Sequence, residues 1–329
     1  MDLRISDIHE YINTSTLNNY NDIYNSLREI YEIDSDYKDY VLQKIIKNYL
    51  EESNKKKKII QSRKHKLKQL KKLELPEQRS PEWYELRKKI LTASSLGSAI
   101  DKCHFQSRDE LILSKIEEKP FEPNPITEWG VKYEEVAIMF YEELHNVKVL
   151  DFGLIPHPEL SIFGASPDGI CDDTGNDEFV ARMVEIKCPP KRKFTKTVPH
   201  HYWMQVQGQL EVCDLDECDF FQVKLEEYDS FEDYSNDKFI NDDIIVPGRT
   251  NLNYPKGVVI TCKEGEQLSY IYSKLNQTNE ELMKWIQENE KENDTIFEIK
   301  WWRITRYENT LVTRDRQWWN EQLENILKF

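Results

Sequence analysis

The stretch Gly164-Ala165-Ser166-Pro167-Asp168-Gly169, followed by Val184-Glu185-Ile186-Lys187-Cys188-Pro189, decides the fold of this chain. Side chains alternate between the two faces of a strand, so Glu185 and Lys187 point to one side and Ile186 points to the other. Turn-forming residues fill 172–177, and apolar residues rebuild a strand after them. The pattern predicts a hairpin that brings Asp168 beside Glu185.

The residue types of this hairpin suit a divalent metal. Two carboxylates and a backbone carbonyl are ligands for Mg²⁺, a hard cation that keeps several waters. Lys187 is not expected to be a ligand, because its ammonium can instead orient an attacking water and offset charge on the phosphorus. Beside a metal its pKa can also fall far enough for it to accept a proton. The motif predicts metal-assisted hydrolysis of phosphodiester bonds, and the alternative is an exposed hairpin with a surface Glu-Lys pair.

Residues 79–97 predict two short helices around an anion pocket. Ser80 is placed as a helix cap before a proline at the first helical position, and Arg87 lies near the end of that helix. Thr92 is placed to cap a second helix, whose free amides and Ser94 hydroxyl would face the anion. Arg87 can bind a phosphate there with two N–H groups. The alternative is a pair of ordinary surface helices.

Two further helices carry polar side chains at informative positions. Residues 128–141 form an amphipathic pattern in which Glu134 sits amid apolar spacing. A glutamate there is costly to bury unless it binds a cation or hydrogen-bond donors. Residues 202–210 predict a helix with Gln205 and Gln209 one turn apart on one face, which is alternatively a solvated face.

These residues resemble the phage lambda exonuclease family, the YqaJ-type viral recombinases or alkaline exonucleases within the PD-(D/E)XK nuclease superfamily. Five blocks match in order: Ser80-Pro81-Glu82-Trp83 with Arg87 and Thr92-Ala93-Ser94; Trp129-Gly130 with Glu134; Ser166-Pro167-Asp168-Gly169; Glu185-Ile186-Lys187-Cys188-Pro189; and Tyr202 with Gln205 and Gln207. The resemblance spans about residues 78–226. It implies an α/β fold, with a restriction-endonuclease-like core whose central mixed sheet is flanked by helices.

The resemblance also implies roles for individual residues. The implied metal ligands are Asp168, Glu185, the backbone carbonyl of Ile186, and Glu134; the implied catalytic set adds Lys187 and Gln205; and the implied 5′-phosphate pocket is Arg87, Ser94 and Ser166. The implied cofactor is Mg²⁺, as two ions, with Mn²⁺ as a substitute. One departure is Lys88-Lys89-Ile90, where many relatives carry a glycine between the arginine and the Thr-Ala-Ser.

The activity implied by the resemblance is 5′ to 3′ digestion of one strand of linear double-stranded DNA that bears a 5′ phosphate. Such an enzyme makes single-stranded tails for recombination, repair or viral DNA processing, with a single-strand annealing protein as partner and a ring-shaped homotrimer as assembly. One alternative is a structure-specific or restriction-like endonuclease on the same core. Another is a catalytically silent DNA-binding scaffold, against which the intact Asp168, Glu185 and Lys187 argue.

Charge is unevenly distributed along the chain. The net charge is −15, yet residues 53–72 hold ten Lys or Arg and no acid. This basic tract predicts either contacts to DNA phosphates or a solvated helix. A second basic group, Lys191, Arg192 and Lys193, directly follows the Glu-x-Lys strand and is better placed to hold a DNA backbone.

The remaining pattern predicts the domain organisation. Residues 1–75 read as a helical accessory region and residues 76–329 as the nuclease domain, with an acidic inserted loop at about 226–243. Strands are expected near 147–155, 168–172, 179–187, 219–226 and 257–263, with a helix at 197–212. Long helices are expected from there to the end. Trp301, Trp302, Trp318 and Trp319 are expected to pack in a core or interface instead of stacking on bases.

Composition indicates the cellular setting. Six cysteines include no Cys-x-x-Cys pair, which argues against a zinc ribbon and for reduced thiols in an intracellular protein. No apolar run approaches a membrane span, and the first residues do not read as a signal peptide. The abundance of Asn, Lys, Ile and Tyr suits an AT-rich genome. The expected location is the host cytoplasm or replication site of a large DNA virus, or otherwise a bacterial cytoplasm.

Overall fold

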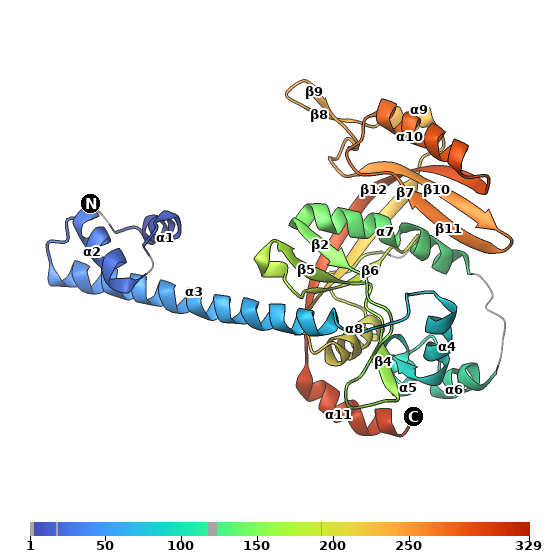
Figure 1. Cartoon of the computed structure of the whole chain (residues 1–329), viewed down its shortest axis with the longest axis horizontal. Coiled ribbons are helices and arrows are strands. Elements are labelled where there is room, and N and C mark those ends of the chain that lie inside the picture. The colour runs from blue at the N-terminus through green and yellow to red at the C-terminus, as the bar shows by residue number, and fades with distance from the viewer. Residues whose placement is uncertain (1–2, 18, 118–123, 192) are drawn as a thin grey trace. The chain divides into compact units, whose positions relative to one another are not determined.

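The computed structural model describes residues 3–17, 19–117, 124–191 and 193–329. The chain divides into two compact units, Met1–His65 and Lys66–Phe329, and the long helix α3 (Asp36–Leu70) contains the boundary (Figure 1).

The first unit has a small core of its own. Helices α1 (Ile5–Thr14), α2 (Tyr20–Ile30) and the first turns of α3 bury Ile8, Leu42 and Ile46 completely. Helix α2 begins at Asn19, whose side chain accepts a hydrogen bond from the backbone N–H of Asp22. The apolar residues at three- and four-residue spacing are therefore helical, as expected.

The basic tract continues α3, and its last residues have partners within the second unit. Lys66 Nζ donates to the Asp214 carbonyl at 2.7 Å and lies 3.2 Å from the Asp214 carboxylate. Lys71 pairs with Asp172. These two lysines therefore hold the end of α3 against acidic side chains. Contact of the rest of the tract with DNA stays a prediction.

The second unit is built on a mixed seven-stranded sheet with the order β11-β10-β12-β7-β6-β5-β2. Only β6 and β7 are parallel among these neighbours in the described chain. The strands are β2 (Val147–Leu150), β5 (Gly169–Gly175), β6 (Met183–Lys187), β7 (Glu217–Glu227), β10 (Lys256–Glu264), β11 (Gln267–Tyr272) and β12 (Ile296–Thr313). The predicted fold class, a mixed sheet flanked by helices with a helical N-terminal region, is confirmed.

Helices α7 (Pro125–His145) and α8 (His200–Val212) cover opposite faces of this sheet. Val184 and Ile186 of β6 share a core with residues of α7, whereas Met183 belongs to the core that contains α8. Side chains alternate along a strand, so Glu185 and Lys187 lie on the α8 face. The alternation expected from the sequence is therefore present.

A second sheet, of order β1-β4-β3, leads into the Ser-Pro-Asp-Gly segment. Its strands are β1 (Leu91–Thr92), β3 (Ile155–Pro156) and β4 (Phe163–Ala165). Helices around it are α4 (Pro81–Lys89), α5 (Leu96–Ala99), α6 (Arg108–Ile116) and α11 (Arg316–Leu327), with 3₁₀ turns at Ala93–Ser95 and Asp177–Phe179. Because β4 ends at Ala165, the small sheet fixes the position of the backbone that leads into Ser166 and Asp168.

Of the two helices predicted over residues 79–97, the first is present as expected and the second is not. Ser80 caps α4 as expected, since its side chain accepts from the Trp83 N–H at 3.2 Å. The expectation that Thr92 caps a second helix is wrong. Its hydroxyl lies 3.1 Å from the Ser94 hydroxyl, and the 3₁₀ turn and four-residue α5 that follow are too short to act as a helix-end anion site.

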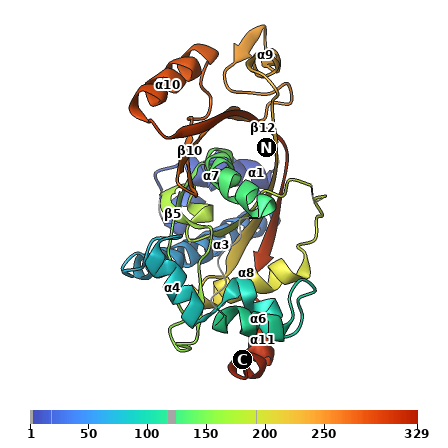
Figure 2. The ribbon, with the colours of Figure 1, turned by 90° about the vertical axis from the view of Figure 1, so that its right-hand side faces the viewer.

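The prediction of long helices to the C-terminus is wrong for residues 296–313, which form the 18-residue strand β12. Trp302 and Ile304 are fully buried, whereas the intervening Arg303 is only half-buried. This alternation and the aromatic and β-branched residues favour a strand that pairs on both sides, with β10 and β7. Helices do flank it, as α10 (Asn279–Glu292) and α11 (Figure 2).

The acidic segment is folded, in contrast to the loop that was expected. It contains α9 (Phe231–Asn236) and a hairpin of β8 (Phe239–Asn241) and β9 (Ile244–Val246). Tyr234 is fully buried, its ring centroid 4.6 Å from that of Trp301, and its carbonyl accepts from the buried Lys256 ammonium. Buried apolar side chains therefore anchor a segment whose surface is acidic.

The cysteines are all free thiols, and only Cys103 is not buried. Burial raises the pKa of the Cys171 and Cys213 thiols to about 12. Among the described residues, no helix combines the length and the apolar character that crossing a bilayer requires.

Candidate active site

The β5–β6 hairpin places Asp168 beside the Glu-Ile-Lys segment. Gly169 pairs with Val184 in the antiparallel register, so Asp168 faces the strand just beyond the last pair. Asp168 Oδ2 accepts a hydrogen bond from the backbone N–H of Ile186 at 2.7 Å. The predicted juxtaposition of Asp168 and Glu185 is therefore correct.

Lys187 lies at the centre of a group of oxygen atoms. Its Nζ contacts the Glu185 carboxylate, donates to the Ile186 carbonyl oxygen at 3.0 Å and lies 3.8 Å from Asp168 Oδ2. Burial by itself would lower the pKa of Lys187, but the charges of Glu185 and Asp168 outweigh it and raise that pKa above its ordinary value. The two carboxylates therefore favour the ammonium form of Lys187.

Helix α8 satisfies the buried carboxylate of Glu185, whose residue is 0% exposed. Gln205 Nε2 donates to Glu185 Oε1 at 2.7 Å, and Gln209 Nε2 donates to Glu185 Oε2 at 2.7 Å. An ionised carboxylate without such donors would be very costly to bury. The one-turn spacing of Gln205 and Gln209 predicts their shared helix face, but a role was expected only for Gln205, and the contact of Gln209 with Glu185 was missed.

Glu134, on α7, is held by Arg79, a residue that no sequence motif pointed to. Arg79 Nη2 donates to both carboxylate oxygens of Glu134, at 3.0 and 2.8 Å. Arg79 also has a positive φ of 66°, a conformation that costs free energy for a residue with a side chain. Burial, opposed by the charge of Arg79, raises the pKa of Glu134.

Asp168 is in an environment that disfavours its negative charge. Burial first, and then the nearby charge of Glu185, raise its pKa well above the ordinary value, although Lys187 opposes this. Three carboxylates, those of Asp168, Glu185 and Glu134, face the two cations that pair with them, Lys187 and Arg79, and a bound cation would offset the remaining negative charge.

The three residues of the predicted phosphate pocket come together. Arg87 Nη2 donates to the Ser94 hydroxyl at 3.3 Å, and its guanidinium lies 4.3 Å from the ring centroid of Trp83. The Trp83 indole N–H donates to the Ser166 hydroxyl at 3.0 Å. Trp83 therefore links Arg87 to Ser166, a function that the sequence pattern did not reveal.

One cavity of about 180 Å³ is lined by both groups of residues. Its walls include Arg87, Ser94 and Ser166 on one side and Asp168, Glu185, Lys187, Gln205 and Gln209 on the other. Glu134 lines a neighbouring cavity of about 210 Å³, which shares Gln78, Arg79 and Asp168 with the first. Arg79 and Asp168 therefore stand between Glu134 and the rest of the site.

Gln78 supports the segment that carries Asp168. Its Nε2 donates to the Pro167 carbonyl at 3.0 Å, to the Phe152 carbonyl at 2.9 Å and to Asp151 Oδ1 at 3.0 Å. These bonds fix the backbone immediately before Asp168.

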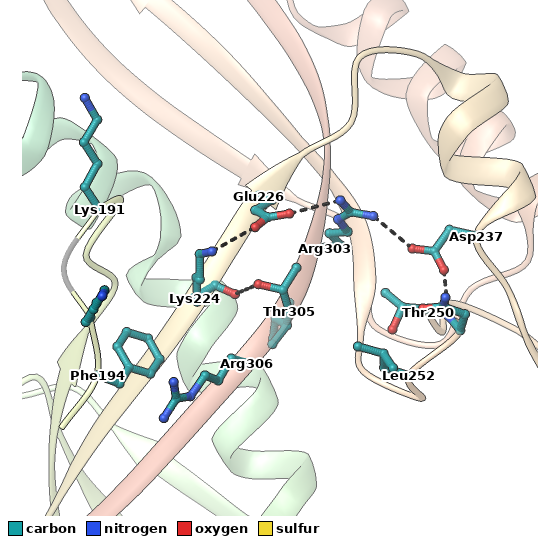
Figure 3. Close-up of a pocket in the computed structure, with 13 residues that line it drawn as sticks. Lys191, Phe194, Lys224, Glu226, Asp237, Thr250, Leu252, Arg303, Thr305 and Arg306 are labelled. Carbon is teal, nitrogen blue, oxygen red and sulfur yellow. Dashed lines mark hydrogen bonds and ion pairs between the residues drawn. The ribbon is translucent and has the colours of Figure 1, made fainter. Parts of the chain in front are cut away.

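The second basic group is not part of this cavity. Lys191 and Lys193 line a different and larger one, of about 660 Å³ (Figure 3). Arg192 lies outside the described residues.

The oxygen atoms expected to hold a metal surround a positive charge. In the part of the chain that the structure describes, no three Asp, Glu, His or Cys side chains gather closely enough to form a metal cluster, and Glu134 is paired with Arg79. Asp168, Glu185 and the Ile186 carbonyl nevertheless converge on one cation, the Lys187 ammonium. Hard oxygen donors around a positive charge are what Mg²⁺ or Mn²⁺ requires, so this donor set fits such an ion.

Comparison with known proteins gives a match to a domain family over part of the chain. Residues 82–216 match the model of the YqaJ-like viral recombinase domain. The uncharacterized protein R354 of Acanthamoeba polyphaga mimivirus is 33% identical over 294 residues, which cover 79% of this chain and 53% of that protein. The chain thus spans about half the length of the curated relative it matches.

Two solved structures are also similar. An alkaline exonuclease from Laribacter hongkongensis, LHK-Exo, shares 22% identity with a TM-score of 0.37, over 65% of this chain and 90% of that one. A phage-related exonuclease from Haemophilus somnus 129PT shares 15% identity with a TM-score of 0.31, over 60% and 89%. The resemblance predicted from the sequence agrees with the domain match, since residues 82–216 are similar to the YqaJ-like viral recombinase domain.

Proposed function

We propose that this protein is a metal-dependent DNA exonuclease that digests one strand of linear double-stranded DNA from a 5′-phosphorylated end. The observation that carries the proposal is that Lys187 and two carboxylates share one small cavity with Arg87, Ser94 and Ser166. A pocket for a terminal phosphate at this position anchors the strand end beside the hydrolytic residues. The product would be a single-stranded tail suited to recombination, repair or viral DNA processing.

Asp168, Glu185 and the Ile186 carbonyl are the proposed ligands of Mg²⁺, with Mn²⁺ as a substitute. Glu134 is the proposed ligand of a second ion, for which Arg79 has to move. When bound, such ions polarise the scissile phosphate and lower the pKa of water. The fit of the oxygen donors supports this assignment.

The side chains of the chain itself carry the other proposed steps. The Lys187 ammonium donates a hydrogen bond to the attacking water and offsets negative charge on the phosphate in the transition state. Gln205 and Gln209 fix the Glu185 carboxylate in one orientation through its two oxygens. Arg87 and the hydroxyls of Ser94 and Ser166 bind the terminal phosphate, with the guanidinium stacked on Trp83.

A homotrimer, a single-strand annealing partner and action in a viral replication compartment or a bacterial cytoplasm follow only from the family resemblance. They belong to the same proposal. Size measurement in solution and co-purification would test the assembly and the partner.

The experiment that tests the function is digestion of linear duplexes with 5′-phosphate or 5′-hydroxyl ends, beside a closed circle, with Mg²⁺ and with chelator. Release of mononucleotides from the phosphorylated linear strand is the expected result. Cutting of the circle would assign the protein as an endonuclease instead. A lack of Mg²⁺-dependent product on every substrate, with DNA binding retained, would leave a binding scaffold.

A further inference from the structure

A groove of about 660 Å³ lies beside the large sheet, outside the candidate active site, and includes Lys191 and Lys193 of the second basic group (Figure 3). Its walls are the segment after β6, the strands β7 and β12, and the loop around Thr250. Five basic side chains line it, Lys191, Lys193, Lys224, Arg303 and Arg306, against two acidic ones, Glu226 and Asp237. In a chain with a net charge of −15, this local excess of positive charge is unusual.

A β-bulge places the basic side chains of β12 on one face. Ile304 pairs with Leu225 of β7, but the next pair is Arg306 with Lys224, so Thr305 is the extra residue. In a regular strand Arg303 and Arg306 would point to opposite faces, because their separation is odd. The bulge removes this alternation and brings both arginines to the face that carries Lys224 and Glu226.

Part of this charge is neutralised within the protein, and part is not. Arg303 lies 3.0 Å from the Glu226 carboxylate and 3.4 Å from that of Asp237, and Lys224 lies 3.1 Å from Glu226. Among the described residues, the ion-pair partner of Arg306 is Glu308, at 3.6 Å; its guanidinium also lies 5.3 Å from the ring centroid of Phe194, and its side chain is 55% exposed.

Lys191 and Lys193 complete the positive side of the groove. Both are exposed, and among the described residues neither forms an ion pair. The groove therefore presents three cations that are available to an anion, Lys191, Lys193 and Arg306, above a layer of internal ion pairs.

The groove continues the face of the sheet that carries the candidate active site. Lys187 of β6 pairs with Gln222 of the parallel neighbour β7, and Lys224 is two residues further along that strand on the same face. Strand spacing and rise place the Lys224 backbone about 8 Å from that of Lys187. Arg306, one strand further out, is roughly 12 Å away, a distance comparable to three or four nucleotide steps along one strand.

We infer that this groove binds the phosphodiester backbone of DNA a few nucleotides from the bond that is cut, with Lys191, Lys193 and Arg306 as its phosphate contacts. The inference rests on the proposed function, because it takes DNA as the substrate. Contacts of this kind hold a strand in position without reading its sequence. Arg303 is a positioning residue here, since its ion pairs hold the wall of the groove.

The test measures DNA binding in chelator, so that cleavage does not enter the result. A Lys191→Gln, Lys193→Gln, Arg306→Gln variant of the full chain is compared with a matched control, Lys263→Gln, Lys274→Gln, Lys284→Gln, which removes the same charge outside the groove. Fluorescence anisotropy gives the affinity for a labelled duplex with a 5′ phosphate and for a single strand of the same sequence, over a series of salt concentrations. Thermal unfolding checks that both variants are folded.

The groove variant is expected to bind more weakly than the control and to show a shallower dependence of log affinity on log salt. Loss of three contacts reduces the slope by about 2.7 for duplex DNA and by about 2 for a single strand. A change confined to the duplex assigns the groove to uncut DNA, and one confined to the single strand assigns it to the product strand.

Equal affinities and slopes for the groove variant and the control would overturn the inference. If the triple variant does not fold, Arg306→Gln alone is compared with Lys284→Gln, with an expected change in slope of about 0.9 on duplex DNA. A chain that shows the groove effect but never cuts DNA would contradict the proposed exonuclease and leave the groove assignment in place.

Discussion

Two glutamates of one sheet have opposite surroundings. Glu185 on β6 is fully buried and receives hydrogen bonds from two neutral amides and one ammonium. Glu226 on the neighbouring β7 has a side chain that is 36% exposed, and it lies between two cations, Lys224 and Arg303. Glu185 therefore has one cation and two neutral donors, whereas Glu226 has two cations, one of which it shares with Asp237.

The surroundings of these two glutamates give the two ends of one sheet face charges of opposite sign. Around Glu185, together with Asp168 and Glu134, negative charge is in excess and favours a bound metal cation. Around Glu226 positive charge is in excess and favours phosphate. A nuclease needs both, because its metal and its DNA have opposite charges. The predictions below test whether each half acts as its charge suggests.

The largest effect is expected at the centre of the acidic half. Replacement of Lys187 by alanine removes the only cation that contacts Glu185 in the described chain, together with the proposed water-orienting group. We expect the cleavage rate to fall by roughly 10²–10⁴-fold, while DNA binding in chelator stays close to that of the wild type. Gel assays with Mg²⁺ and anisotropy with chelator measure the two properties, and Lys284→Ala is the control. A wild-type cleavage rate would remove Lys187 from the mechanism.

A smaller effect is expected at the phosphate pocket. Its arginine, Arg87, is proposed to bind a DNA phosphate, as are the cations of the groove. Arg87→Ala should abolish the preference for 5′-phosphorylated over 5′-hydroxyl ends. Hydrogen bonds to a charged group contribute about 1.5–3 kcal/mol, so digestion of phosphorylated ends should slow by roughly 10–100-fold. The ratio of rates on the two ends is the measurement. A ratio that stays at its wild-type value would separate Arg87 from the phosphate.

Gln209→Ala tests how the buried carboxylate tolerates the loss of one neutral donor. It leaves Glu185 Oε2 without the amide that donates to it at 2.7 Å. An unsatisfied buried acceptor costs about 1–3 kcal/mol, and urea unfolding should show a loss of that size. Gln317→Ala, on the exposed face of α11, is the matched control and should change stability little. Equal stabilities would mean that water or Lys187 replaces the amide.

The smallest effect concerns the ion pairs under the basic groove and depends on pH. Burial would raise the pKa of Asp237, but hydrogen bonds from the Asn251 N–H and the Tyr228 hydroxyl, together with Arg303, lower it overall. A carboxyl with a depressed folded-state pKa stabilises the fold above its unfolded pKa of about 3.9 and loses this contribution as pH falls through the folded value.

We therefore expect Asp237→Asn to cost about 1 kcal/mol at neutral pH and progressively less below about pH 4. Denaturant unfolding at a series of pH values gives the difference between the two proteins. A difference that does not change between pH 7 and pH 3 would contradict the role of the Asp237 charge.

The two halves of the sheet also differ in how far the sequence predicted them. The acidic half comes from a short hairpin, in which strand alternation and a turn bring Asp168, Glu185 and Lys187 together within a local segment. The face that Gln205 shares with Gln209 follows from helix spacing in the same way. Local periodicity in the sequence was therefore enough to predict most residues of the candidate active site.

In the basic groove, Lys191 and Lys193 were predicted as a basic group, but the contribution of β12 and the role of Arg79 could not be predicted in this way. Arg306 pairs with Lys224, a residue 82 positions away in the sequence. The face of the sheet to which the Arg306 side chain points depends on a β-bulge, and no residue pattern predicts this bulge. The strand β12 was itself mistaken for a helix, since its charged residues interrupt the apolar alternation that marks a half-buried strand. Arg79 owes its contact with Glu134 to a backbone conformation that is rare for arginine.

The single half-exposed thiol has a practical consequence. Because the other cysteines are buried, a maleimide dye added to the native protein should react at Cys103 and nowhere else in the folded chain. Cys103 lies against Gly97 of α5, directly after the segment that carries Ser94. A dye attached there would give an optical signal of DNA arrival at the phosphate pocket, without any substitution in the sequence.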